Sequence, residues 1–311
     1  MSEFFLELFS EEIPANLQES ARDNLLKEFK ILFQKQNIDY KQENRALSTP
    51  NRLIIYFQNI NKQIFLLPKE IKGPSISAPE KAIEGFIKSN QAEKKNIYKK
   101  NTEKGEFYFY KKPSKKINTA DILSDQIPKI LEKLVWKKSM KWGDNDLYWG
   151  RPLKSIMSVF DHKPLKFKFY HLTSSNLTYV EKDFEEKTKS FKNFNSYLSY
   201  FGSRNIIIDN EKRKNKIEKE LVKFSKKKNL KIFIDKSLLN EVTNLVEKPK
   251  IILCSFDKKF LDMPKEIIII TMQQHQKYFP TIDNKDNLTN NFFIVSDTQD
   301  LKGFVKMGNE R

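Results

Sequence analysis

The segment Trp136–Pro152, WKKSMKWGDNDLYWGRP, contains all three tryptophans of the chain, interleaved with basic residues. Flat aromatic rings beside positive charge suit nucleic-acid binding, because bases stack on the rings and phosphates pair with the cations. This pattern predicts contact with RNA or a partner subunit for Lys137, Lys138, Lys141 and Arg151. The competing interpretation is a packed turn with its lysines in water, whose structural residues are Trp136, Trp142, Gly143 and Trp149.

Charge extends the prediction beyond this segment. The chain carries 57 basic and 40 acidic residues, a formal net charge of +17, which favours a polyanionic partner. Most of the excess lies in two lysine-rich stretches, 94–116 and 211–231. The second stretch adds three contact candidates, Lys226, Lys227 and Lys228. Two alternatives stay open: the abundance of lysine over arginine is typical of an AT-rich genome, and residues 212–228 also fit the solvated face of an amphipathic helix.

Residue sets for catalysis are not found in the sequence. The three histidines have no metal-ligand spacing with cysteine or carboxylates, and the Gly303–Gly308 spacing lacks the Lys-Ser of a phosphate-binding loop. His275 has helical spacing with Met272 and Phe279, which favours a histidine packed in the core. Cys254 lies in the apolar run IILCSF, which favours a buried thiol. We therefore expect no catalytic residue, no metal site and no bound cofactor in this chain.

The elements that position these residues indicate an α+β fold, with two or three small α/β units and a helical, lysine-rich middle. A strand at Phe4–Phe9, a helix after Pro14 and a strand at Leu53–Phe57 predict an N-terminal unit over 1–71. Residues 72–150 are predicted to hold a linker, the basic region and the tryptophan segment, and 151–311 a second α+β unit. Asp262 is predicted to cap the start of a helix that includes residues 267–279. Without a membrane-spanning apolar run or a basic leader, we expect a cytoplasmic protein with no membrane contact.

Several long motifs resemble those of one family. They are FFLELFSEEIP from Phe4, TPNRL from Thr49, KGPSISAPEKAIEGF from Lys72, the tryptophan segment, LLNEVTNLVEKP from Leu238, FLDMPKEIIIITMQQHQKYFP from Phe260, and GNER at the end. In this order they are similar to the bacterial glycyl-tRNA synthetase beta subunit, and ELFSEEIP and KSMKWG suggest its alphaproteobacterial branch. The family continues for several hundred residues past GNER, so the resemblance covers its N-terminal portion.

The chain departs from the family's pattern at three places. Asn51 precedes Arg52 where the family has two arginines, SSNLTYVEKDF replaces a run containing arginine and histidine, and Lys248 stands where tryptophan is common. Within the matching motifs, Arg52 and Lys277 are further candidates for tRNA or subunit contact.

The resemblance implies a non-catalytic beta subunit of glycine–tRNA ligase, an aminoacyl-tRNA synthetase. Such a subunit binds tRNA(Gly) and the alpha subunit in an α2β2 assembly, while ATP with magnesium and glycine bind to alpha. Any HD-type or anticodon-binding region would lie beyond Arg311. The alternative is a stand-alone RNA-binding module or a degenerate split product without ligase activity.

Overall fold

The computed structural model describes residues 2–40, 43–66, 68–103, 105–181 and 187–311. The chain divides into two compact units, a first of Met1–Ile60 with Ser124–Arg311 and a second of Asn61–Leu123. The predicted domain boundaries at 71 and 150 do not coincide with this division, in which the chain leaves the first unit and later returns to it. The predicted α+β class is confirmed, because helices accompany antiparallel sheets in both units.

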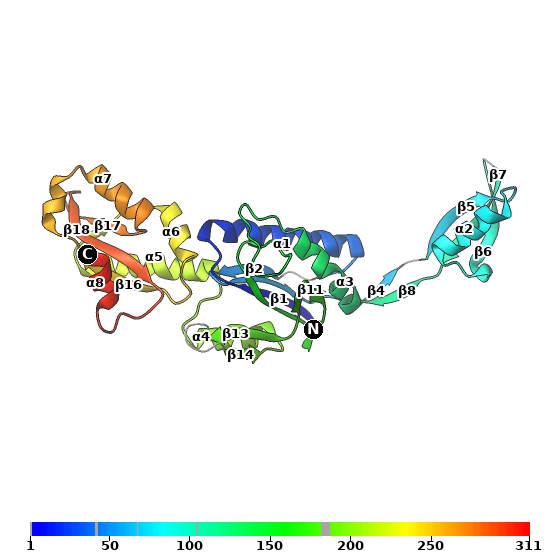
Figure 1. Ribbon diagram of the computed structural model, residues 1–311, viewed down its shortest axis with the longest axis horizontal. Coiled ribbons are helices and arrows are strands. Elements are labelled where there is room, and N and C mark those ends of the chain that lie inside the picture. Colours follow the sequence, from blue (N-terminus) through cyan, green and yellow to red (C-terminus); the bar gives the residue numbers. More distant parts are fainter. Residues whose placement is uncertain (1, 41–42, 67, 104, 182–186) are drawn as a thin grey trace. The chain divides into compact units, whose positions relative to one another are not determined.

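The first unit contains a five-stranded antiparallel sheet in the order β10-β9-β1-β3-β2. Figure 1 labels two of its strands, β1 and β2. Its strands are β1 (Glu3–Ser10), β2 (Asn44–Thr49), β3 (Arg52–Gln58), β9 (Leu153–Phe160) and β10 (Lys163–Pro164).

Helices cover both faces of this sheet. Two successive residues of β1 show this, since successive side chains of a strand point to opposite faces. The ring of Phe4 in β1 lies 5.3 Å from that of Phe29 in α1 (Ala15–Gln36). The next residue, Phe5, lies 5.1 Å from Phe194 in α4 (Phe194–Gly202) on the other face. The predicted N-terminal strand, helix and second strand are thus confirmed as β1, α1 and β3.

The C-terminal part of the first unit contains a four-stranded antiparallel sheet in the order β15-β17-β18-β16. Figure 1 labels three of its strands, β16, β17 and β18. Its strands are β15 (Lys231–Ile232), β16 (Lys250–Ser255), β17 (Phe279–Ile282) and β18 (Leu288–Ser296). Two helices, α5 (Asn210–Lys227) and α6 (Lys236–Thr243), pack their apolar residues against Phe279 and Phe293. A second cluster around Cys254 and Phe292 involves α7 (Lys265–Ile270), the π-helical turn η3 (Thr271–His275) and α8 (Phe304–Glu310).

The chain outside residues 61–118 contains several further elements. They are α3 (Thr119–Glu132), the hairpins β11 (Lys168–Phe169) with β12 (Leu172–Thr173) and β13 (Leu177–Glu181) with β14 (Lys187–Ser190), and the 3-10 turn η2 (Lys258–Asp262).

The second unit holds a three-stranded antiparallel sheet in the order β5-β7-β6 and a pair, β4-β8. The elements are β4 (Gln63–Leu66), β5 (Lys69–Ser75), α2 (Glu80–Asn90), η1 (Lys94–Asn96), β6 (Ile97–Thr102), β7 (Gly105–Lys112) and β8 (Lys115–Asn118). Residues 72–75, predicted as part of a linker, belong to β5. Their glycine and proline resemble linker residues, yet β5 is an edge strand, where proline is tolerated.

Two predictions for the helix expected over 267–279 are wrong. Asp262 does not cap α7, which begins after Pro264 without a side-chain cap. His275 is exposed rather than packed, whereas Met272 is buried. The reason is the π-helical turn, whose wider hydrogen-bond spacing removes the three-to-four-residue periodicity that would have placed both residues on one face. Phe279 then lies in β17 and not in the helix.

Candidate functional site

The tryptophan segment forms a closed turn. Met140 and Trp149 exchange two backbone hydrogen bonds of 2.8 and 3.1 Å, and Gly143 adopts a φ of +55° between them. The Trp149 ring is 1% exposed and lies 5.2 Å from Trp136. Trp136 packs directly on the backbone of Gly150, where a Cβ atom would meet its ring at 2.4 Å. This close approach explains why glycine precedes Arg151.

The cations of this turn point outward. Lys137, Lys138 and Lys141 are exposed, and the Lys141 ammonium lies 2.7 Å from the Asp146 carboxylate. Tyr148 is 64% exposed beside them in the sequence. The structure therefore combines the two interpretations: Trp149 is core, while three lysines and an aromatic ring reach solvent. We call Lys137, Lys138, Lys141 and Tyr148 the tryptophan-turn surface.

Two residues of the segment occupy intermediate positions. Trp142 is half-buried with its ring edge-to-face against His171, at a centroid distance of 6.2 Å. Arg151 is half-buried too, and its Nη1 donates to the Gly150 carbonyl at 2.9 Å.

Arg52 corrects the sequence prediction. It is 3% exposed, with Nη1 2.7 Å from Glu247, Nη2 donating to the Tyr179 carbonyl at 2.8 Å, and Nε 3.3 Å from Glu7. Its guanidinium also lies over the ring of Phe9. A cation enclosed by two carboxylates is a structural residue and cannot contact RNA at the surface.

Glu7 is the centre of this buried network, and sequence reasoning missed it. Thr178 and Tyr197 both donate hydroxyl hydrogen bonds to its carboxylate. Burial raises the pKa of Glu7, while Arg52 and the two hydroxyls act in the opposite direction. The available signal was a lone acid inside the apolar run of β1, because a charged side chain at a buried position of a strand requires a partner.

The remaining contact candidates lie in the C-terminal part of the first unit. Lys226, Lys227 and Lys228 are exposed at the end of α5, whose Ile217 and Leu221 are buried and whose Phe224 is partly exposed. Lys277 is already engaged: its ammonium lies 2.8 Å from Glu241 and donates to the Gln274 carbonyl. The structure does not place Lys277 beside the tryptophan segment, since it follows η3 in the C-terminal part.

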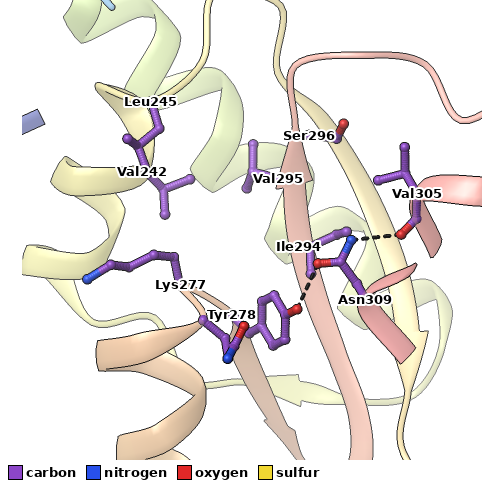
Figure 2. Close-up of a pocket in the computed structure, with 10 residues that line it drawn as sticks. Val242, Leu245, Lys277, Tyr278, Ile294, Val295, Ser296, Val305 and Asn309 are labelled. Atoms are coloured by element: carbon purple, nitrogen blue, oxygen red, sulfur yellow. Dashed lines mark hydrogen bonds between the residues drawn. The ribbon is translucent and has the colours of Figure 1, made fainter. Parts of the chain in front are cut away.

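Lys277 lines a cavity of about 310 Å³ (Figure 2). Apolar side chains including Val242, Ile294 and Val305 line it, and the Tyr278 hydroxyl donates to Asn309 at 2.7 Å. The ten lining residues include no carboxylate, histidine or cysteine, so the ionisable groups that line the cavity are the Lys277 ammonium and the Tyr278 hydroxyl. Figure 2 shows the Lys277 side chain directed away from Tyr278 and Asn309.

Metal clusters and membrane spans are both absent from the described residues. No group of three or more histidine, cysteine, aspartate or glutamate side chains in them could hold a metal ion. No helix within the described part of the chain is long and apolar enough to cross a membrane.

Comparison with known proteins gives consistent matches. The family model described as glycyl-tRNA synthetase beta subunit matches residues 4–311. Relatives named glycine–tRNA ligase beta subunit include those of Rickettsia felis and Rickettsia prowazekii, each 35% identical, and of Rickettsia bellii, 36% identical. Each alignment covers 100% of this chain and 47% of the relative. The chain therefore spans about half the length of these curated relatives.

Proposed function

We propose that this chain, which belongs to the glycyl-tRNA synthetase beta subunit family, binds tRNA and docks to the alpha subunit of a glycine–tRNA ligase. The reaction joins glycine to tRNA(Gly) with conversion of ATP to AMP and diphosphate. In this proposal ATP, magnesium and glycine bind to alpha, the assembly is α2β2, and the chain itself supplies no reacting group. The supporting observation is the family match along the whole chain.

Exposed cations are the groups through which this chain would hold tRNA. Lys137 and Lys138 on the tryptophan-turn surface, with Lys226, Lys227 and Lys228 at the end of α5, have ammonium groups open to solvent. Lysine contacts to phosphate release counterions, so affinity falls as salt rises. Lys141 and Arg151 would contribute less freely, because Asp146 and the Gly150 carbonyl already engage them.

The first test is reconstitution with the alpha subunit. Tagged alpha is mixed with this chain, and the retained chain and the charging of tRNA(Gly) with labelled glycine are measured. We expect retention, faster charging than with alpha alone, and no glycine-dependent ATP–diphosphate exchange by this chain alone. RNA binding without retention by alpha would favour the stand-alone RNA-binding module.

The second test addresses tRNA. If roughly five phosphates are neutralised, the log–log slope of affinity against salt should be about −3 to −5. Replacing Lys226, Lys227 and Lys228 with glutamine should flatten that slope. Affinity that does not change between low and moderate salt would show that the net charge is compositional only.

A further inference from the structure

One face of the small sheet in the second unit combines aromatic rings with lysines. The strand register pairs Lys72 of β5 and Tyr98 of β6 with Phe109 of the central strand β7, and Lys100 with Phe107. Paired residues share a face, and Lys111 lies two positions beyond Phe109 on that face. We call Lys72, Tyr98, Lys100, Phe107, Phe109 and Lys111 the basic aromatic face.

Side-chain contacts verify this arrangement. The Lys72 ammonium lies 3.6 Å from the centroid of Phe107, and that of Lys100 lies 5.2 Å from Phe109. The Tyr98 ring stacks beside Phe109 at 6.2 Å. Two of the three rings, Phe107 and Phe109, therefore lie beside a cation on the same surface.

The opposite face of the sheet carries helix α2. The Phe86 ring of α2 approaches Gly73 so closely that a Cβ atom there would lie 2.7 Å from it. Gly73 follows Lys72 and so points to the other side of β5. Because α2 occupies that side, the basic aromatic face is the side of the sheet without its helix.

Most side chains of the basic aromatic face are exposed to solvent. Tyr98 is 37% exposed, Phe107 is half-buried, and Lys72, Lys100 and Lys111 are exposed. Phe109 lies beneath them and is buried. One carboxylate, Glu70, accepts hydrogen bonds from Tyr98 and Lys100. Three lysines against this acid leave the face positive.

The surrounding unit has the same charge sign. Residues 61–123 contain 14 lysines, no arginine and seven acidic residues, so this fifth of the chain carries +7 of the net +17. A positive field over exposed rings is complementary to a polyanion that carries planar bases.

We propose that the basic aromatic face binds an unpaired, single-stranded stretch of RNA, with a base stacked on Tyr98 and the lysines on phosphates. RNA supplies a partner for both kinds of side chain on this face: the exposed Tyr98 ring takes a base and the lysine ammonium groups take phosphates. An unpaired strand is required because bases inside a duplex cannot stack on a flat protein face. This inference rests on the proposed function, in which the RNA is tRNA, but it assigns the contact to a specific surface.

The test uses the full chain and three fluorescent probes: a short single-stranded RNA, its duplex, and an abasic strand with the same backbone. Binding is followed by anisotropy over a range of salt. We expect the single strand to bind at least about fivefold more tightly than the abasic strand, from one base–ring stack. Tyr98→Ala should remove that difference and leave abasic affinity unchanged, while Tyr98→Phe should retain it. A misfolded variant would lose affinity for the abasic strand too.

A second set of variants tests the contribution of the lysine charges and has a matched control. Replacing Lys72, Lys100 and Lys111 with glutamine should reduce the magnitude of the salt slope by about 2, since each contact with a single strand contributes about 0.7. Removing the same charge from the exposed Lys27, Lys30 and Lys35 of α1 should leave the slope unchanged. Equal effects of the two triple variants, or duplex bound as tightly as single strand, would overturn the proposal.

The proposed function and this face can fail separately. Retention by alpha and charging of tRNA(Gly) measure the former, and the short probes measure the latter. If the Lys72, Lys100 and Lys111 variant lost retention by alpha while its affinity for RNA stayed constant, the face would be a protein-docking surface and the RNA proposal would be wrong.

Discussion

Nη1 of Arg52 lies 2.7 Å from Oε1 of Glu247, although 195 positions separate the two residues, and both side chains are buried. The pair joins β3 of the N-terminal sheet to the segment that follows α6. Arg213 makes a second link, because its Nη2 donates to the Ser48 carbonyl at 2.9 Å and its Nε to the Thr243 carbonyl at 2.8 Å. Buried arginines thus connect the N-terminal sheet to α5, α6 and the segment after α6, which belong to the C-terminal part of the first unit.

Breaking the Arg52–Glu247 pair should strongly destabilise the protein. Glu247→Gln keeps the size of the side chain but removes the nearer of the two carboxylates beside the buried guanidinium, so we expect a loss of about 3 kcal/mol or more. The control is Asp125→Asn, which breaks an exposed pair with Lys129 at the same 2.7 Å distance. That change should cost less than about 0.5 kcal/mol. Urea denaturation measures both; similar losses would show that burial does not govern the pair.

The pH dependence of stability should reveal the raised pKa of Glu7. Burial raises its pKa above 4.5, so the native state binds more protons than the unfolded state between 4.5 and the folded value. The stability that Glu7 contributes therefore falls as the pH rises through that window. We expect the difference in unfolding free energy between the wild type and Glu7→Gln to shrink from pH 4.5 upward, as measured by urea denaturation at several pH values. A difference that grows with pH would contradict the raised pKa.

Gly150→Ala should disrupt the tryptophan turn. The new methyl group would lie 2.4 Å from the Trp136 ring, and overpacking of this kind costs about 1–3 kcal/mol. The change should appear both in the melting temperature and in tryptophan fluorescence. Gly85→Ala is the matched control, because nothing lies within 4 Å of its Cβ position in the exposed interior of α2. There alanine should stabilise by about 0.5–1 kcal/mol. An unchanged fluorescence spectrum for Gly150→Ala would mean that the turn adapts.

Substitutions of Trp149 and Trp142 should differ in their effect on stability. Trp149 is buried, so Trp149→Ala should cost about 3–5 kcal/mol. Trp142 is half-buried against His171, so Trp142→Ala should cost less. Lys138→Ala with Lys141→Ala should change stability by no more than about 0.5 kcal/mol yet weaken binding of tRNA or alpha. Thermal melts beside binding assays distinguish these effects. Equal losses for the two tryptophans would contradict the difference in burial.

Local patterns predicted the elements that depend on local spacing. The apolar stripe after Pro14 predicted α1, and the run at Leu53–Phe57 predicted β3, since these residues form the core directly. The motifs also identified the family. By contrast, the burial of Arg52 depends on Glu7 and Glu247, which are far away in the sequence, so a basic residue in a family motif was mistaken for a surface contact.

The candidate site was predicted in a similar, partial way. Exposed lysines of the tryptophan turn follow from the cost of burying an unpaired ammonium. The basic aromatic face does not follow from the lysine-rich composition of 94–116, because it requires the pairing of β6 and β7 with β5. The register places Lys72 beside rings that lie more than thirty positions later in the chain.

Cys254 should resist alkylation in the native protein. Its thiol is 1% exposed in the cluster with Phe292, and burial raises its pKa to about 11. The thiolate is the nucleophile, and it forms only as the pH approaches the pKa, so at pH 8 a raised pKa and lack of access both slow the reaction. Iodoacetamide labelling followed by mass spectrometry should give little product in buffer and complete labelling in denaturant. Adding urea below the unfolding midpoint tests which event exposes the thiol. Labelling that rises only with global unfolding fits a core cysteine, whereas rapid labelling in buffer would show that the packing of β16 against α8 opens in the native state.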